Sequence, residues 1–582
     1  MKNTAKLQFP TSVSFLPRSG FAEVTSYSVP KHRAITDLNL DSNEGQCLPQ
    51  GLFNSVFDTL DNDIRRYPSA AELEQLIAKE LGVKPQRIIV TAGADEALDR
   101  ICRLALAPGR TIILPEPTFE MIRRYATLAC GDIVSIPWTS PYYPLDEVLA
   151  AIDEHTALIA LVSPNNPDGK IASRSDLIEL SKAAPNALII VDLAYEEFAE
   201  KSLLETAISM PNTVTLKTFS KAWGLAGLRV GYAISHPQII DWMRAAGGPY
   251  SVSQLSLAMA RQALESSHAH VGEFIGKIRA NRRVLETALS DLGAVVTHSQ
   301  GNFAFARFRD AKWVRDGLAG LGIAIRIFPN NASLLNSVRI TVPADNGDFK
   351  RLLAALSTCL APEAIVFDMD GVLADVSHSY RTAIISTASH FGLTLSPSDV
   401  DSAKSEPNSN NDWVVATRLI SRAGIGTSLQ EVTEVFETFY QGTDRLNGLK
   451  YTESLIPSVE LIRDLASHLP LAVVTGRPRA DAEYFLEVSG IREYFSAMSC
   501  MEDAPSKPHP AGVLQVLSEL GVSRAWMVGD NIADISAARS AAVVPIGIIP
   551  PGAEAPLASE ALLNAGAARI IESLDKLREL LP

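Results

Sequence analysis

The chain has 582 residues, of which 47% are hydrophobic and 20% are charged, and its formal net charge is -14. This length is roughly three to four times that of a usual domain, so several hydrophobic cores are expected. The negative charge and the pI near 5.3 disfavour nucleic acid and anionic membranes as partners. Small anionic substrates must therefore be held by local positive groups.

Neither secretion nor membrane insertion is indicated, so the cytosol is the predicted location. No apolar run approaches about eighteen residues, and the first residues lack the continuous apolar segment of a signal peptide. The 5 cysteines are scattered without CxxC spacing. This pattern argues against a disulfide framework or a zinc site.

The first 360 residues alternate apolar strands with amphipathic helices. Ser69 and Glu72 predict a capping box, and Leu73 and Ile77 mark the apolar face of a helix that ends at Gly82. Strands are predicted at 87–91, 111–114, 157–162, 188–192, 213–216, 229–234, 326–328 and 337–342, and a helix at 348–360. The alternation predicts an α/β fold with a mostly parallel sheet and helices on both faces.

The first chemical centre is a lysine that follows a strand. Lys221 comes directly after Ser220, and Arg229 follows in a glycine-rich stretch. Such a segment offers an amine for a covalent link to an aldehyde cofactor and a cation for an anion nearby. Asp192 ends a predicted strand, where its carboxylate could keep a pyridinium nitrogen protonated. The plainer interpretations are a surface lysine and a helix-capping aspartate.

Two loops add to this centre. Asn166 lies in the turn 163–169 and could donate to a phenolate oxygen, although its neighbours are also ordinary turn residues. Segment 91–96 follows a strand and opens a helix, whose free N–H groups could hold a cofactor phosphate. Each loop alone is a weak signal. Their order and spacing together predict a pyridoxal-phosphate site.

Residues 35–360 resemble fold-type I pyridoxal-phosphate aminotransferases of the class I/II group, most closely the histidinol-phosphate aminotransferases. The matching segments are Asn43-Glu44, Arg66-Tyr67-Pro68, Gly93-Ala94-Asp95-Glu96, Pro117-Thr118-Phe119, Asn165-Asn166-Pro167, Asp192 with Tyr195 and Phe198, Ser220-Lys221 with Arg229, Asn302-Phe303, and Arg339-Ile340-Thr341-Val342. The resemblance implies that Lys221 binds the cofactor and moves the proton, while Asp192 pairs with the ring nitrogen. It also implies a homodimer.

The same resemblance distributes the other contacts over the cofactor and the substrate. It places Asn166 and Tyr195 at the 3-oxygen, Phe119 on the ring, and at the phosphate Gly93, Ala94, Asp95, Ser220, Arg229 and, from the other subunit, Tyr67. Asn43, Arg326 and Arg339 are expected to bind the substrate. Asp168, Leu193 and the serines of 249–253 depart from the family pattern. These departures leave the amino-acid substrate open, since related enzymes include a threonine-phosphate decarboxylase.

The second chemical centre begins at Asp368 and Asp370, which follow an apolar run at 364–367. Two such carboxylates at a strand end, with Gly371 for a tight turn, can serve as nucleophile and general acid toward phosphorus. An Asp-rich turn is the plain alternative. Three later strand ends weigh against that alternative, and they carry Thr475-Gly476, Lys507, and Asp530 with Asp534. All could meet at one sheet edge and hold a hard divalent ion.

Residues 364 to about 575 resemble the haloacid dehalogenase superfamily. The resemblance implies a Rossmann-like domain in which Asp368 becomes phosphorylated, Asp370 acts as acid and then base, and Thr475, Gly476 and Lys507 hold the phosphoryl group. Asp368, Asp370 through its carbonyl, and Asp530 would bind Mg²⁺, with Asp534 as a further ligand or an orienting residue. The polar segment at about 376–455, with helical patterns at 379–391 and 428–440, is expected to form a cap.

Together these patterns predict an aminotransferase at 1–360, a short linker at 361–363, and a phosphatase at 364–582. Transamination of imidazole-acetol phosphate with glutamate gives histidinol phosphate, and a phosphatase would release histidinol, so we hypothesise consecutive steps of histidine biosynthesis. The alternatives are an aminotransferase for another amino acid, a phosphatase of unrelated specificity, and an idle C-terminal module that only stabilises a dimer.

Overall fold

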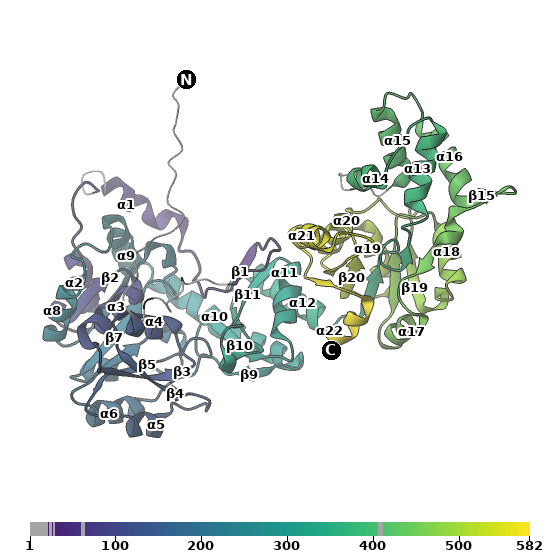
Figure 1. Cartoon of the computed structure of the whole chain (residues 1–582). Helices are drawn as coiled ribbons and strands as arrows, with labels where there is room; N and C mark the ends of the chain where they lie inside the picture. The colour runs from purple at the N-terminus through teal and green to yellow at the C-terminus, as the bar shows by residue number, and fades with distance from the viewer. Residues whose placement is uncertain (1–20, 22–25, 27–29, 60–63, 405–410, 582) are drawn as a thin grey trace.

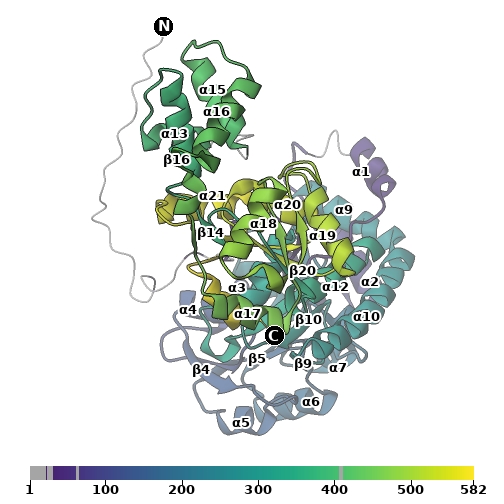
Figure 2. The same cartoon turned by 90° about the vertical axis from the view of Figure 1, so that its right-hand side faces the viewer.

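The computed structural model describes residues 21, 26, 30–59, 64–404 and 411–581. Two groups of elements lie side by side, and a helical extension rises from the second group (Figure 1). Turned by 90°, the second group lies in front of the first and the extension projects away from both (Figure 2). Within the described ranges, no helix is long and apolar enough to cross a membrane.

The first group is built around a seven-stranded sheet in the order β2-β8-β7-β6-β5-β3-β4. Only β8 runs antiparallel to its neighbours, so the predicted mostly parallel sheet is confirmed. Its strands are β2 (Ile88–Thr91), β3 (Thr111–Glu116), β4 (Asp132–Pro137), β5 (Thr156–Val162), β6 (Leu188–Asp192), β7 (Thr213–Thr218) and β8 (Gly231–Ile234). Alternate strand residues enter two separate cores, one under each layer of helices. These helices are α3 (Gly93–Ala105), α4 (Glu120–Leu128) and α8 (Pro237–Ala245) on one face, and α5 (Leu145–Ala150), α6 (Arg174–Ala183) and α7 (Leu204–Ser209) on the other.

The helix predicted after Ser69 is α2 (Ala71–Glu80), but the predicted capping box is wrong. Ala70 occupies the N-cap position and makes no side-chain cap hydrogen bond. The Glu72 carboxylate is bound instead by Arg261, which lies on α9 (Gln254–Ser266). The Glu72 side chain, which the local pattern assigned to the helix cap, therefore forms a long-range ion pair instead.

A smaller sheet in the order β1-β11-β12-β10-β9 completes the first group. Its strands are β1 (Leu38–Leu40), β9 (Val295–Thr297), β10 (Phe303–Arg307), β11 (Ile323–Ile327) and β12 (Ser337–Thr341). Apart from β1 and β11, they pair antiparallel, so the predicted strands at 326–328 and 337–342 lie outside the parallel sheet. Helices α10 (His268–Asp291), α11 (Ala311–Gly320) and α12 (Asn346–Leu360) pack with this sheet.

The second group contains a six-stranded, fully parallel sheet in the order β19-β18-β13-β20-β21-β22. Its strands are β13 (Ala364–Phe367), β18 (Leu471–Val474), β19 (Phe495–Ser499), β20 (Ala525–Gly529), β21 (Val544–Ile548) and β22 (Arg569–Ile571). One face packs on α17 (Val459–His468) and α18 (Arg479–Val488), the other on α19 (Ala511–Leu520) and α20 (Ile532–Ser540). This arrangement confirms the predicted Rossmann-like fold.

The helical cap predicted for the second fold is present. It comprises α13 (Tyr380–His390), α14 (Pro397–Lys404), α15 (Asp412–Arg422) and α16 (Leu429–Gln441), which share a core of their own. The short paired strands β14 (Ala374–Asp375) and β17 (Ser454–Leu455) carry the chain into the cap and back. The cap is therefore attached to the sheet through one two-stranded ribbon.

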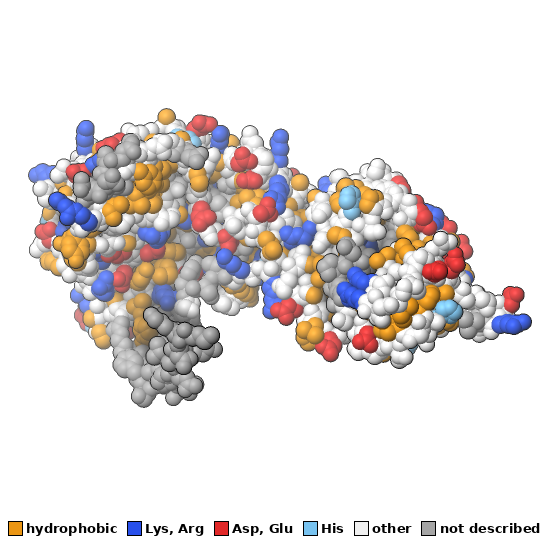
Figure 3. Space-filling view, turned by 90° about the horizontal axis from the view of Figure 1, so that it is seen from above, with side chains coloured by type: hydrophobic (Ala, Val, Ile, Leu, Met, Phe, Trp, Pro, Cys, Tyr) orange, Lys and Arg blue, Asp and Glu red, His pale blue; other side chains and the backbone are white. Residues whose placement is uncertain are grey.

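The two groups share a buried boundary, although the surface narrows between them when seen from above (Figure 3). Helices α11 and α12 belong to the first group and contact β20, β21 and β22 of the second. Trp313 packs edge-on against Trp526, with ring centroids 5.0 Å apart. The Trp526 indole N–H donates to the Thr358 carbonyl at 3.0 Å, and Arg569 pairs with Asp316 at 2.9 Å. The contact thus combines apolar packing with buried polar bonds.

Candidate active sites

The first predicted site lies at the carboxyl ends of neighbouring parallel strands. Asn166 follows β5, Asp192 ends β6 and Lys221 follows β7. Parallel strands present their carboxyl ends at one edge of the sheet, which is where ligands bind in such folds. Chain topology therefore brings together three residues that are far apart in the sequence.

Lys221 faces this edge. Its Nζ donates to the Ser42 carbonyl at 3.1 Å and lies 5.5 Å from the centre of the Tyr195 ring. The Tyr195 hydroxyl accepts from Asn43 Nδ2 at 3.1 Å, and the buried Asn43 also bonds Thr341. Asn43, predicted as a substrate residue, thus holds Tyr195 in place beside the lysine.

A second lysine four residues earlier in the chain is excluded by its environment. Lys217 is buried and pairs with Glu196 at 3.0 Å and Glu197 at 2.7 Å. Burial alone would lower the pKa of Lys217, but the two carboxylates overcome this effect and raise it well above its usual value. Lys217 is therefore held as an ammonium ion by its two carboxylate partners, whereas Lys221 lies at the carboxyl edge of the sheet where the prediction requires an amine.

Asp192 is buried at the end of β6. Burial raises the pKa of its carboxyl to about 6, the charge of Asp95 adds to this rise, and Lys217 and Lys221 oppose it. The Ala194 N–H donates to Oδ1 at 3.0 Å. A buried carboxyl whose charged form needs a further donor fits a protonated pyridine nitrogen.

The predicted phosphate residues Gly93, Asp95 and Arg229 lie together at the start of α3. A Cβ at position 93 would lie 2.7 Å from Arg229 Nη2, and Gly93 has φ +76°, so only glycine fits there. Arg229 pairs with Asp95 at 2.8 Å. Ala94 lies in the same helical turn, and the buried Ser220 is held by Thr218. The helix start and the guanidinium suit a phosphate.

Arg326 and Arg339 are direct partners across the antiparallel strands β11 and β12. Arg339 donates to Asn166 Oδ1 at 2.6 Å and to the Asp41 carbonyl at 2.7 Å. The bond from Arg339 occupies the amide oxygen of Asn166. The Asn166 NH₂ group is then left as the donor to a phenolate oxygen, as the prediction requires. Arg326 lies 3.3 Å from Glu120. Two guanidinium groups thus stand beside the predicted cofactor residues, where they can bind an anion.

Three further residues that the sequence analysis named are Tyr67, Phe119 and Asp168. Tyr67 is 81% exposed and stacks on Tyr250, with ring centroids 4.6 Å apart. Phe119 is partly buried at the N-cap of α4. Asp168, one of the departures from the family pattern, accepts from Asn165 and pairs with Lys170 at 3.1 Å. The Asp168 side chain therefore bonds to other residues of its own loop.

The second predicted site is a cavity of about 240 Å³ between the parallel sheet and the cap. The sheet side supplies the predicted residues Asp368, Asp370, Thr475, Gly476, Lys507 and Asp530. The cap side supplies Arg381, Lys404 and Asp412, which the sequence did not single out. The four predicted strand-end motifs thus converge, and the cap covers them.

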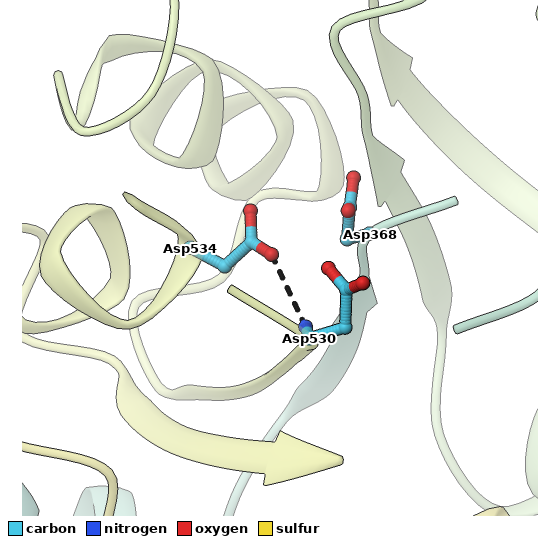
Figure 4. A group of neighbouring side chains, drawn as sticks. All are labelled: Asp368, Asp530 and Asp534. Carbon is cyan, nitrogen blue, oxygen red and sulfur yellow. Dashed lines mark hydrogen bonds between the residues drawn. The ribbon is translucent and has the colours of Figure 1, made fainter. Parts of the chain in front are cut away.

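Three carboxylates crowd together at this site, two of them lining the cavity and the third, Asp534, buried behind them (Figure 4). Oxygen atoms of Asp368, Asp530 and Asp534 lie within 4.8 Å of one another. Lys507 Nζ lies 2.6 Å from both Asp368 and Asp534. Burial, and then repulsion by Asp534, raises the pKa of Asp368 to about 7, and the same causes raise that of Asp530. One ammonium group does not balance this charge, so the oxygen cluster fits a hard divalent cation.

Asp534 has an orienting position in the cluster. Its Oδ2 accepts from the N–H groups of Asp530 at 3.2 Å and Asn531 at 3.3 Å, as part of a capping box at α20. Its Oδ1 faces Lys507. A Cβ on Gly529 would lie 2.2 Å from Asp534 Cβ, so this close approach requires glycine. Of the two predicted roles, the geometry favours that of an orienting residue.

Arg477 and Glu453 belong to the site but were not predicted to act there. Arg477 is buried and lies 2.6 Å from Asp370 Oδ1 and 2.8 Å from Glu453 Oε2. The Thr475-Gly476-Arg477 run gave the only sequence signal for the arginine. Nothing local marks Glu453, because the cap ends beside it and its partner lies in another loop.

The family model for aminotransferase class I and II matches residues 52–356, and that for haloacid dehalogenase-like hydrolase matches residues 362–542. A histidinol-phosphate aminotransferase of Thermoanaerobacter sp. (strain X514) is 30% identical over 330 residues, which are 56% of this chain and 92% of the relative. An imidazoleglycerol-phosphate dehydratase of Phytophthora nicotianae is 43% identical over 197 residues, which are 32% of this chain and 44% of that protein.

Among solved structures, the histidinol-phosphate aminotransferase from Sinorhizobium meliloti in complex with pyridoxal-5'-phosphate is similar to this chain. The TM-score is 0.55 at 25% identity, and the match covers 60% of this chain and 98% of that one. The chain therefore belongs to the aminotransferase class I and II family, and its C-terminal part is a haloacid dehalogenase-like hydrolase domain.

Proposed function

We propose that this chain is a bifunctional enzyme that transaminates imidazole-acetol phosphate to histidinol phosphate and then hydrolyses the phosphate ester. One observation carries the proposal: residues suited to a pyridoxal-phosphate site and residues suited to phosphoryl transfer gather at two sheet edges of one chain. The similarity to proteins named histidinol-phosphate aminotransferase and imidazoleglycerol-phosphate dehydratase supports a place in histidine biosynthesis. The proposed limits are 1–360 and 364–582, joined at 361–363, with the cap at about 376–455 and the enzyme in the cytosol.

For the first reaction we assign pyridoxal phosphate as cofactor. Lys221 would hold the cofactor in the resting enzyme, and the cofactor would supply an electron sink for the α-carbon after the amino-acid substrate has displaced Lys221. The freed Lys221 amine would then move the proton at that carbon, and Asp192 would hold the ring nitrogen. Arg326 and Arg339 would bind the anionic end of either partner, because a guanidinium group suits both carboxylate and phosphate.

We further propose a homodimer in which Tyr67 reaches the cofactor phosphate of the other subunit. Tyr67 and Tyr250 form an exposed aromatic pair beside a hollow of about 560 Å³ that Arg100 and Arg244 also line. An exposed aromatic pair next to a hollow suits burial against a second copy.

For the second reaction we propose that Asp368 attacks phosphorus, so that an aspartyl phosphate forms and the alcohol leaves. Asp370 protonates the leaving oxygen and then takes a proton from the water that hydrolyses the aspartyl phosphate. Lys507, Thr475 and Gly476 hold the phosphoryl oxygens. Asp368, the Asp370 carbonyl and Asp530 would bind Mg²⁺, which offsets the crowded negative charge.

Both half-reactions can be tested on the purified full chain. Imidazole-acetol phosphate with glutamate should yield 2-oxoglutarate, and histidinol phosphate with Mg²⁺ should release inorganic phosphate. Other amino donors and phosphate esters serve as competitors. Preference for another amino acid would support the alternative aminotransferase assignment, and release of phosphate from every ester except histidinol phosphate would refute the pathway link. Absence of hydrolysis altogether would support an idle C-terminal module.

A further inference from the structure

Arg477 connects the proposed general acid to the base of the cap. On one side its guanidinium lies 2.6 Å from Asp370 Oδ1, through both Nε and Nη2. On the other side its Nη1 lies 2.8 Å from Glu453 Oε2. The arginine side chain is 1% exposed and that of Glu453 is 3% exposed. This is a buried ion bridge in which one guanidinium group serves two carboxylates.

Glu453 belongs to the cap side of this bridge. It directly precedes β17, one of the two strands of the ribbon that attaches the cap. The Tyr440 hydroxyl at the end of α16 donates to Glu453 Oε1 at 3.2 Å. Any change in the angle of the cap must therefore displace Glu453 or break this bond.

Aromatic rings of the cap make a second connection to the same arginine. Tyr380, the first residue of α13, stacks on Tyr440 with ring centroids 4.6 Å apart. The Arg477 guanidinium lies 5.1 Å from the centre of the Tyr380 ring. A cation over an aromatic ring is attracted to its face, more strongly where water is excluded. Arg477 is thus bound to the cap through both a charge and a ring.

We infer that Arg477 is a positioning residue that couples the position of the cap to the orientation of Asp370. This inference rests on the proposed phosphatase function. Asp370 lies in the loop after β13 and lines the cavity. Because Asp370 belongs to neither a helix nor one of the named strands, regular secondary structure does not fix the direction of its carboxylate. The Arg477 guanidinium fixes that carboxylate, because its Nε–H donates to Asp370 Oδ1 at 2.6 Å and its Nη2 lies 2.6 Å from the same oxygen as an ion pair. When the cap displaces Glu453, the Nη1 side of the Arg477 guanidinium moves with it, and so do Nε and Nη2, which face Asp370.

The test compares two phosphate esters that differ in how much they need the acid. The leaving group of 4-nitrophenyl phosphate is a stable anion, whereas an alkyl phosphate such as histidinol phosphate releases a strongly basic oxygen that requires a proton. We expect Arg477→Gln to lower kcat/KM about 100-fold for the alkyl ester and less than about 10-fold for the aryl ester. Asp370→Asn should show the same bias, and Arg477→Lys should recover part of the loss.

Two further variants separate positioning from general damage. Glu453→Gln acts from the cap side and should shift the ratio of the two kcat/KM values in the same direction, by about 3- to 10-fold. Arg479→Gln, at the first residue of α18, removes an ion pair to Asp503 in the segment after β19 and should leave the ratio unchanged. Transaminase activity of each variant confirms that the chain is folded.

The possible failures point to different conclusions. If Arg477→Gln and Glu453→Gln lower the turnover of both esters equally, Arg477 only stabilises the fold and the inference is wrong. If Asp370→Asn shows no bias although the wild type is active, the general-acid role in the proposed function is wrong. If the wild type hydrolyses neither ester, the phosphatase function itself fails, and the inference fails with it.

Discussion

The two sites lie at the carboxyl ends of parallel strands, but they differ in how their charges are balanced. In and beside the first site, Arg229 pairs with Asp95 and Lys217 pairs with Glu196 and Glu197, while Asp192 is a single buried carboxyl with a pKa raised to about 6. In the second site buried carboxylates outnumber the nearby ammonium group of Lys507. The first site therefore buries one carboxyl, Asp192, whereas the second brings three carboxylates together around one ammonium group.

This difference suggests what each site requires from its cofactor. An anionic phosphate entering the first site would meet Arg229 and the free N–H groups at the start of α3, which can receive its charge. A divalent cation entering the second site removes repulsion among Asp368, Asp530 and Asp534. We therefore expect the two activities to be separable by single substitutions and by metal removal.

The largest separation is expected from Asp368→Asn. The amide keeps the size of the side chain but removes the nucleophile, so phosphate release should fall by at least about 10⁴-fold. Transamination should stay within about twofold of the wild type, since Asp368 lies on the other sheet. The check is phosphate release and 2-oxoglutarate formation measured on the same sample. Phosphatase activity that survives this change would assign the nucleophile to another residue.

Lys221→Ala should produce the reverse pattern. Loss of the amine removes both the covalent link to the cofactor and the proton carrier, so transamination should fall by at least about 10³-fold. Phosphate release should persist, and chelation by EDTA should abolish it in this variant as in the wild type. The bound-cofactor absorbance band provides a second measurement. An unchanged band and unchanged transamination would contradict the choice of Lys221 over Lys217.

The sequence predicted most strand ends because the polar candidate site residues interrupt apolar runs there. Asp192, Asp368 and Lys221 each lie at or just after a predicted strand, and the structure places them at the sheet edges. The mostly parallel sheet of the first group followed from the same local patterns, whereas the two families and the cap were implied by the resemblance of the motifs to known families. These features depend on near neighbours in the chain, so they can be read without coordinates.

The features that were missed depend on contacts between distant segments. Glu72 was expected to cap its own helix but pairs with Arg261. β4 was not predicted because five of its six residues are exposed or only partly buried, so its sequence lacks the apolar run of the central strands. The bridge from Arg477 to Glu453 joins a sheet loop to the cap. No local periodicity encodes which distant charge a side chain will meet.

A smaller effect should show whether the two sites share one folding unit. Trp313 is 3% exposed and packs on Trp526 across the boundary, so Trp313→Ala should lower the free energy of unfolding by about 3–5 kcal/mol. Both activities should then be lost over the same, lower range of temperature. The exposed Trp242 provides the control, since Trp242→Ala should change stability by less than about 0.5 kcal/mol. Separate transitions, with only one of them shifted, would contradict a shared unit.

The smallest effect concerns the charge balance of the first site without its cofactor. Burial raises the pKa of Asp192 to about 6, so the folded chain holds this proton more tightly than the unfolded chain does. Folding is therefore penalised as the pH rises from about 4 to about 6, by about 3 kcal/mol in total, and the penalty stays constant above that range. Asp192→Asn removes the titrating group. In urea unfolding of cofactor-free protein, the wild type should lose stability relative to this variant between pH 4 and 6, and parallel curves would show that Asp192 is not desolvated.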